Sequence, residues 1–216
     1  MNKLITSAGT GGPRDGVLRD DLPQFAFIGR SNVGKSSLLN ALMRERLART
    51  SAAAGKTRQA NIYQVTMQGG LGRPGAWNAY LVDLPGYGYA RGGNDSVEEL
   101  ATVVHAYFAA RNQGQAAVGG TARKKRGGAV FLLVDSRHPG LDSDLSAWRW
   151  LSAEVSPLIV VATKIDKLSR TERTKNLREI ERLFAQRPIA VSSTSGEGLD
   201  DLRRAMAKLV TADTEG

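Results

Sequence analysis

Apolar and polar positions along this chain fall into blocks that favour strands and helices in turn. Short apolar runs, typical of strands buried in a sheet, lie at 25–28, 129–134, 158–162 and 188–191. Two more segments of strand character lie at 61–68 and 77–82. Apolar residues spaced three or four positions apart predict helices at 36–47, 97–111, 141–151, 171–184 and 199–210.

Strands that alternate with helices in this order predict a mainly parallel sheet with helices on both faces. The connection between 61–68 and 77–82 is too short for a crossover helix, so these strands should form an antiparallel hairpin. We therefore expect an α/β fold whose sheet is mixed, mostly parallel and six-stranded.

The length of 216 residues suits one domain. Residues 1–22 lack apolar periodicity and contain a glycine-rich stretch, so we interpret them as a flexible tail. The domain should span 23–210, with a Gly/Ala/Gln-rich insertion at 113–127 that ends in the basic run Arg123-Lys124-Lys125-Arg126. Residues 211–216 form a second short tail.

The sequence Gly29-Arg30-Ser31-Asn32-Val33-Gly34-Lys35-Ser36 is a full G-x-x-x-x-G-K-S motif between a predicted strand and a predicted helix. Its glycines let backbone N–H groups close around phosphate oxygens, and the helix N-terminus adds partial positive charge. Lys35 is suited to bridge the β- and γ-phosphates, and the Ser36 hydroxyl to ligate Mg²⁺. The motif predicts the P-loop NTPase class.

The choice of base depends on Thr163-Lys164-Ile165-Asp166, directly after a buried strand. A carboxylate here accepts hydrogen bonds from N1–H and N2–H₂ of guanine, whereas adenine would leave it desolvated and unpaired. The Lys164 stem can lie along the base plane. Backbone N–H groups at Val191-Ser192-Ser193, after the last strand, can contact the guanine O6.

Two further segments point at the γ-phosphate. Asp83-Leu84-Pro85-Gly86 follows a strand, so Asp83 can hold a Mg²⁺-bound water and the Gly86 N–H can reach the phosphate. Thr57 lies in the polar segment Gly55-Lys56-Thr57-Arg58-Gln59, and its hydroxyl can complete the Mg²⁺ shell when GTP is bound.

The composition limits the remaining classes. The cysteine count is 0, which excludes disulfides and thiolate metal sites. We find no signal peptide and no apolar run of the ~18 residues that a membrane span needs, so we expect a cytoplasmic protein without membrane contact. A net charge of +9 favours polyanionic partners such as RNA.

The amino-acid sequences of four segments are more specific than the general GTPase motifs. The segments at 29–40, 83–90 (DLPGYGYA), 135–139 (DSRHP) and 163–168 (TKIDKL) together resemble the EngB (YihA/YsxC) family of bacterial GTPases over roughly residues 20–210. The resemblance implies a monomeric GTPase that assists assembly of the large ribosomal subunit, contacts that particle or its rRNA, and is needed for septation and cell division. Two departures concern the Thr57 segment, where Ala54 replaces a usual proline and Arg58 a common glutamine.

Motifs and resemblance together assign catalytic roles to Lys35 and Thr57, and metal contacts to Ser36, Thr57 and, through water, Asp83. The residues expected to contact GTP or GDP are Gly29, Arg30, Ser31, Asn32, Val33, Gly34, Lys35, Ser36, Gly55, Lys56, Thr57, Arg58, Gln59, Asp83, Leu84, Pro85, Gly86, Thr163, Lys164, Ile165, Asp166, Val191, Ser192 and Ser193.

Hydrolysis by this chain should be slow without help. Ras-like enzymes orient the attacking water with a glutamine directly after D-x-x-G, and this chain has Tyr87 there. One possible helper is K⁺, because Asn32 resembles the asparagine of potassium-activated GTPases; alternatively Asn32 only stabilises the loop. The other is the ribosomal particle itself.

Two alternatives stay open. Tyr87 also suits a nucleotide-gated RNA- or ribosome-binding module in which hydrolysis is incidental. A P-loop ATPase or small-molecule kinase fits less well, because Asp166 favours guanine and no substrate lid is evident. The basic run 123–126 is either a solvated loop or an rRNA phosphate contact.

Overall fold

The computed structural model of the chain describes residues 2–8, 22–48, 60–68, 75–87, 104 and 128–212. Its strands are β1 (Lys3–Ala8), β2 (Gln24–Gly29), β3 (Ala60–Gln68), β4 (Ala76–Asp83), β5 (Gly128–Asp135), β6 (Leu158–Thr163) and β7 (Ile189–Ala190). Its helices are α1 (Lys35–Met43), α3 (Asp142–Glu154), the 3₁₀ helix η1 (Ile165–Lys167), α4 (Arg170–Phe184) and α5 (Leu199–Ala212).

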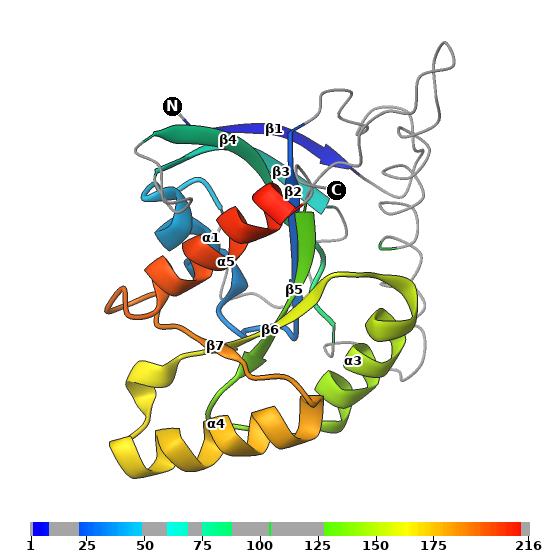
Figure 1. Ribbon diagram of the computed structural model, residues 1–216, viewed down its shortest axis with the longest axis vertical. Coiled ribbons are helices and arrows are strands. Elements are labelled where there is room, and N and C mark those ends of the chain that lie inside the picture. The colour runs from blue at the N-terminus through cyan, green and yellow to red at the C-terminus, as the bar shows by residue number, and fades with distance from the viewer. Residues whose placement is uncertain are drawn as a thin grey trace.

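The strands form one mixed sheet in the order β1-β3-β4-β2-β5-β6-β7 (Figure 1). Pairs from β4 through β2, β5 and β6 to β7 are parallel, whereas β3 pairs antiparallel with β4 and with β1. The predicted hairpin and the mainly parallel α/β architecture are therefore confirmed. Parallel order brings the carboxyl ends of β2, β4, β5 and β6 to the same edge of the sheet, where the predicted motifs lie.

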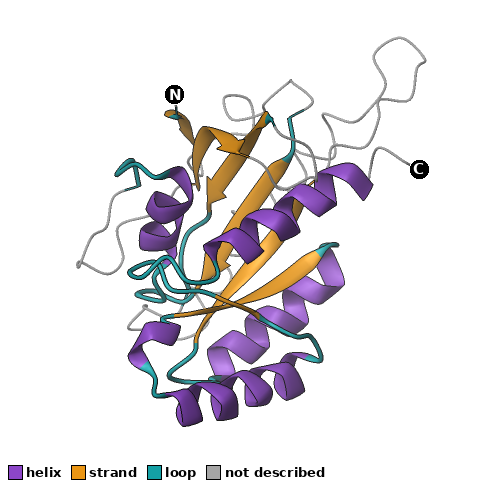
Figure 2. Cartoon of the chain, turned by 60° about the vertical axis from the view of Figure 1, so that its left-hand side comes forward, coloured by secondary structure: helices purple, strands orange, loops and turns teal. Residues whose placement is uncertain are grey.

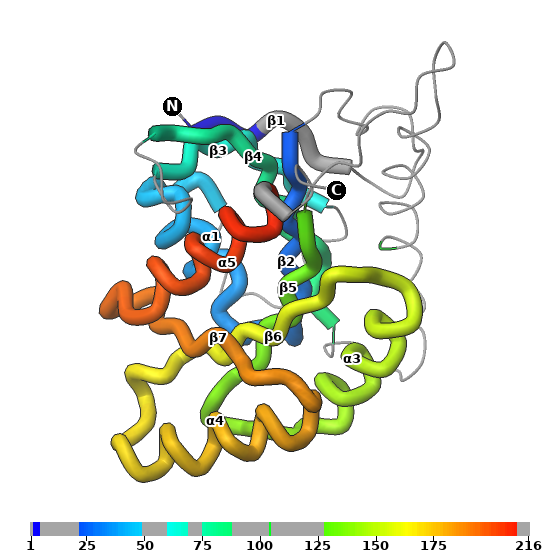
Figure 3. Tube along the Cα trace, viewed as in Figure 1, coloured from blue at the N-terminus to red at the C-terminus, as the bar shows by residue number. Residues whose placement is uncertain are grey.

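Helices cover both faces of the sheet (Figure 2), because neighbouring residues of a strand point to opposite sides. Phe25 and Phe27 of β2 pack with α1 and α5, while Ala26 and Ile28 pack with α3 and α4. The central strand β5 is buried along its whole length, as its continuous apolar run predicts. The Cα trace shows α1 beside α5, whereas α3 and α4 lie together on the other face of the sheet (Figure 3).

The sheet has seven strands in the described residues rather than the six expected, because β1 lies within the segment interpreted as a tail. β1 forms an edge by pairing with β3, with partners such as Lys3↔Gln64 and Ala8↔Ala60. Asn2 fixes its start, since its side-chain amide donates to the Met43 carbonyl at 2.7 Å and accepts from the Thr66 N–H at 3.0 Å. Pairing of this kind depends on main-chain groups, so the sequence pattern of residues 3–8 gave no signal for it.

The predicted helix at 97–111, except residue 104, and the insertion at 113–127 lie outside the described residues. Among the helices that the structure describes, none has the length and apolar character required to cross a membrane.

Candidate functional site

The loop between β2 and α1 leaves the start of the helix without a side-chain cap from the described residues. Gly34 caps α1 with a φ of 103°, a left-handed conformation that suits glycine. Among the described residues no side chain caps this helix, and its first turn holds no acidic residue. By contrast, α4 begins with a capping box in which Ser169 and Glu172 satisfy the helix start. The first turn of α1 thus offers N–H groups and partial positive charge to a phosphate, as the motif predicts.

Lys35 and Asp83 meet at the carboxyl ends of the neighbouring strands β2 and β4. The Lys35 Nζ forms an ion pair with Asp83 Oδ1, and the two side chains are only 11% and 6% exposed. The D-x-x-G segment also contacts the phosphate loop through its backbone, because the Ser31 N–H donates to the Tyr87 carbonyl at 3.0 Å. A Cβ on Gly86 would lie 3.2 Å from the Gly29 oxygen, so glycine permits this close approach.

The oxygen atoms of this region fit a magnesium ion. Mg²⁺ prefers hard oxygen ligands and is usually held by one or two protein groups together with substrate phosphates and waters. Ser36 on the first turn of α1 and Asp83 beside Lys35 supply a hydroxyl and a carboxylate at the position where the phosphates are expected. The third predicted ligand, Thr57, lies outside the described residues, as does the whole segment 55–59.

The region expected to bind the base is tied to the phosphate loop by Thr163 and Lys164. The Thr163 hydroxyl donates to the Val33 carbonyl at 2.7 Å, and Lys164 Nζ donates to the Asn32 carbonyl at 2.5 Å. The phosphate loop and the segment after β6, about 130 positions apart in sequence, are therefore held in direct contact.

Asp166 is prepared as a hydrogen-bond acceptor. The Ser192 hydroxyl donates to its Oδ1 at 2.7 Å, and this bond, followed by a backbone N–H and Lys167, lowers the pKa of Asp166 despite some opposing desolvation. Val191 brings Ser192 to this position, because its N–H donates to the Ala162 carbonyl at 2.8 Å in extension of the sheet. The carboxylate is consequently charged at neutral pH, as acceptance from guanine N–H groups requires.

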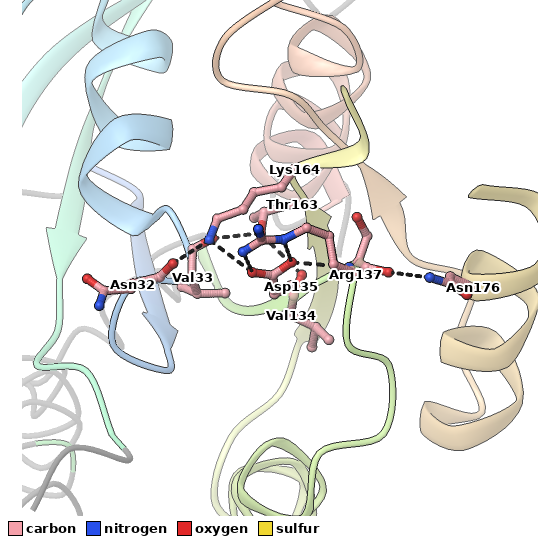
Figure 4. A network of polar contacts seen from close by, with 9 residues as sticks. Asn32, Val33, Val134, Asp135, Arg137, Thr163, Lys164 and Asn176 are labelled. Atoms are coloured by element: carbon pink, nitrogen blue, oxygen red, sulfur yellow. Dashed lines mark hydrogen bonds and ion pairs between the residues drawn. The ribbon is translucent and has the colours of Figure 1, made fainter. Parts of the chain in front are cut away.

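Asp135 and Arg137 also belong to this site, although the sequence patterns assigned them no role (Figure 4). Arg137 donates Nε to Oδ1 of Asp135 at 2.9 Å and Nη2 to Oδ2 at 2.7 Å. Lys164 Nζ donates to the same Oδ2 at 2.9 Å. The signal was available, because an aspartate that ends a buried strand beside β6 must lie next to Thr163 and Lys164.

Tyr87 points away from the expected phosphate position and into the core. Its ring is 3% exposed, and its hydroxyl donates to Asp144 Oδ1 of α3 at 2.9 Å. Burial, followed by the charge and hydrogen bond of Asp144, raises the pKa of Tyr87, so the phenol keeps its proton. Burial also raises the pKa of Asp144, although the Tyr87 hydrogen bond and the Arg30 charge oppose this shift. The Tyr87 hydroxyl is therefore buried and bonded to Asp144.

Asn32 has a conformational reason to be an asparagine. Its φ is 63°, in the left-handed region that asparagine tolerates better than most side chains. This observation favours the loop-stabilising interpretation, and the proposed potassium contact stays a prediction without support from the structure. The basic run 123–126 lies outside the described residues.

Comparison with known proteins gives one consistent result. A family described as 50S ribosome-binding GTPase matches residues 24–164. The chain is 41% identical over 191 residues to a probable GTP-binding protein EngB of Chlorobaculum tepidum, covering 87% of this chain and 88% of that protein. It is 38% identical over 193 residues to the EngB protein of Syntrophomonas wolfei, covering 88% of each.

Solved structures share the fold. Era from Aquifex aeolicus bound to GDP and AlF₄⁻ superposes with a TM-score of 0.63 at 21% identity, covering 88% of this chain and 57% of that one. A crystal structure of a probable GTP-binding protein EngB gives a TM-score of 0.57 at 19% identity, covering 88% of this chain and 99% of that one.

The buried pair of Tyr87 and Asp144 predicts a pH dependence of stability. Because the folded state raises the pKa of Asp144, this group stabilises the fold at low pH, and that contribution is lost as the pH rises through the raised pKa. Asp144→Asn removes the titration, so its free energy of unfolding relative to the parent should increase as the pH rises from about 4 through the raised pKa. Urea denaturation at several pH values measures this.

The exposed Asp142 lies two positions earlier on α3, and Asp142→Asn is the matched control. The control should show no comparable rise with pH. A difference between Asp144→Asn and the parent that stays flat or falls across this range would contradict the assignment.

Proposed function

Because the chain belongs to the EngB family of GTP-binding proteins, we propose that it binds GTP and GDP with Mg²⁺ and acts as a switch in assembly of the large ribosomal subunit. Family membership makes the chain a GTPase. The observation that supports the mechanism best is the meeting of Lys35 and Asp83 beside an uncapped helix start, with Asp166 poised by Ser192 at the same sheet edge.

Guanine specificity comes from the charged carboxylate of Asp166. Ser192 orients one of its oxygens and keeps it ionised, so that the carboxylate faces the ligand as an acceptor only. Guanine presents two donors on the edge that such a group binds, and adenine does not. A desolvated carboxylate without donors is costly, and this cost rejects ATP.

The phosphate end supplies charge stabilisation rather than a catalytic base. Backbone N–H groups of the 29–36 loop and the Lys35 ammonium bind the phosphate oxygens, and they are in place before the charge of the transition state develops. Ser36 and Asp83 would hold the magnesium ion, which neutralises phosphate charge when bound. The Lys35 ammonium, now paired with Asp83, is the group that exchanges a carboxylate for phosphate oxygens when nucleotide binds.

Intrinsic hydrolysis is slow because the position after D-x-x-G contributes no group to the attacking water. The Tyr87 hydroxyl donates a hydrogen bond to Asp144 of α3, and its backbone forms hydrogen bonds with the phosphate loop. Orientation of the water has to come from elsewhere, and the ribosomal particle is the candidate that we propose. Thr57 keeps its predicted role at the γ-phosphate.

The partner we propose is the large-subunit particle, contacted in the cytoplasm by a monomer of this protein. The matched family is described by 50S ribosome binding, and the net charge of +9 suits an rRNA surface. A requirement for this protein in septation would follow from its effect on the supply of ribosomes. The alternative is a nucleotide-gated ribosome-binding module in which hydrolysis is incidental, and the hydrogen bond of the Tyr87 hydroxyl to Asp144 also suits it. The experiments below distinguish this module from the switch.

Replacing Asp166 should change the base that the site selects. In Asp166→Asn the amide donates a hydrogen bond, which suits the C2 carbonyl of xanthine and not the amino group of guanine. We expect GTP affinity to fall by at least about 100-fold and XTP to become the preferred nucleotide. Fluorescence titration with both nucleotides measures this, and Asp200→Asn on the exposed start of α5 is the control. Parent-like GTP binding by Asp166→Asn would refute the assignment.

Tyr87→Phe separates a structural from a catalytic tyrosine. Loss of the hydroxyl leaves Asp144 buried without its partner, so the free energy of unfolding should fall by about 1–3 kcal/mol. The single-turnover rate of GTP hydrolysis at saturation should stay within about two-fold of the parent, because the hydroxyl does not contact the attacking water. A ten-fold slower hydrolysis in folded protein would show that the tyrosine acts in catalysis.

Ribosome association tests the proposed partner and distinguishes the two functions. Large-subunit particles sedimented with the protein should retain it with a non-hydrolysable GTP analogue, and release it with GDP. Lys35→Ala should fail to associate in either state, because it cannot hold the phosphates. Under the switch, GTP itself gives release as it is hydrolysed on the particle. Particle-bound protein that neither hydrolyses GTP faster nor leaves would favour the gated module.

A further inference from the structure

We propose that Asp135 is a positioning residue for the nucleotide, acting by fixing Lys164 across the base site while Arg137 fixes Asp135. The inference rests on the proposed function, since it assumes that Lys164 lies along a guanine. The geometry that carries it is a single carboxylate placed between the end of β5, the end of β6 and the phosphate loop (Figure 4).

The carboxylate of Asp135 is held rigidly. Its side chain is 1% exposed and accepts four hydrogen bonds: from Arg137 N and Nε to Oδ1, and from Arg137 Nη2 and Lys164 Nζ to Oδ2. Burial alone would raise the pKa of Asp135, but the bonds from Arg137 and then Lys164 outweigh it and hold the pKa at about 2. The group is therefore negatively charged at neutral pH and is held in one orientation by these bonds.

Arg137 fills the role of a clamp better than a lysine would. Its Nε and Nη2 form a planar fork on the two carboxylate oxygens at 2.9 and 2.7 Å, which fixes the plane of the carboxylate as well as its position. The Arg137 side chain is 40% exposed, so its burial contributes little to the core. Its loop is fixed in turn by α4, because Asn176 donates to the Ser136 carbonyl at 2.9 Å.

Lys164 is held at both ends of its side chain. Its backbone leaves β6 with a φ of 60°, and its Nζ is fixed between the Asn32 carbonyl at 2.5 Å and Asp135 Oδ2 at 2.9 Å. The stem crosses directly over the phosphate loop, since a Cβ on Gly34 would lie 3.7 Å from Lys164 Cε. A methylene stem fixed in this way presents a flat apolar surface to a purine ring.

Fixing this stem before the ligand arrives changes affinity. A free lysine loses rotamer freedom when a base packs against it, and this loss weakens binding. The Asn32 carbonyl alone leaves the ammonium free to turn about one contact, and the Asp135 charge supplies the second. Asp135 should therefore raise affinity for GDP and GTP equally, since neither contact concerns the γ-phosphate.

A double-mutant cycle tests whether Asp135 acts through Lys164. Kd for GDP and for GTP is measured by fluorescence titration in Mg²⁺ for the parent, Asp135→Asn, Lys164→Ala and the double variant. Asp135→Asn should raise both Kd values by about three- to ten-fold, with an unchanged single-turnover rate at saturating GTP. In the Lys164→Ala background the same substitution should change Kd by less than about 1.5-fold.

Arg137→Gln provides a second variant that does not remove the buried charge. It should give a smaller increase in Kd that also disappears in the Lys164→Ala background. Asp200→Asn is the matched control, because the Asp200 side chain at the start of α5 is 80% exposed. It should leave Kd unchanged, and circular dichroism confirms that each variant is folded at the assay temperature.

The outcomes separate the inference from the function. If Asp135→Asn changes Kd equally in the parent and in the Lys164→Ala background, the inference is overturned and Asp135 has a purely structural role. If Asp135→Asn does not fold, the same comparison with Arg137→Gln decides. An effect on GTP but not on GDP would overturn it as well. A parent chain that binds neither nucleotide would instead overturn the proposed function.

Discussion

The structure depends on the backbone N–H groups at the start of α1, which no described side chain caps and which are therefore open to a ligand. Every helix start carries such groups. In α4 a capping box satisfies them, and α3, which like α1 lacks a side-chain cap among the described residues, has the acidic residues Asp142 and Asp144 in its first turn. The start of α1 has Gly34 in a left-handed conformation, no side-chain cap in the described residues, and Lys35 directly behind it. This arrangement favours an anion strongly, and the remaining parts of the site are arranged around it.

The topology of the sheet explains how distant segments serve this anion. Parallel strands place their carboxyl ends together, so that the loops after β2, β4, β5 and β6 meet. Asp83 reaches Lys35 because β4 pairs with β2. Lys164 reaches Asn32 because only β5 separates β6 from β2 in the sheet. The hairpin of β3 and β4 adds antiparallel strands on one side without disturbing this edge.

The sequence predicted the parts of the molecule that depend on side-chain pattern. Apolar runs located β2, β5 and β6, and the loop motifs located the residues that meet at the sheet edge. β1 was missed because an edge strand can be specified by main-chain pairing with β3, which leaves little trace in residues 3–8. The inward turn of Tyr87 was missed because its partner, Asp144, lies 57 positions away and forms part of no motif. Asp135 stood in a recognisable segment, yet only the register of β5 and β6 shows which lysine it contacts.

The central claim is that one site on this chain recognises a guanine nucleotide through its phosphates and its base together. Isothermal titration of the purified full chain with GTP, in the presence of Mg²⁺ and again with excess ATP, tests this claim most directly. The account predicts saturable binding at a single site, with ATP competing at least about 100-fold more weakly. Absence of GTP binding, or equal binding of ATP, would contradict it.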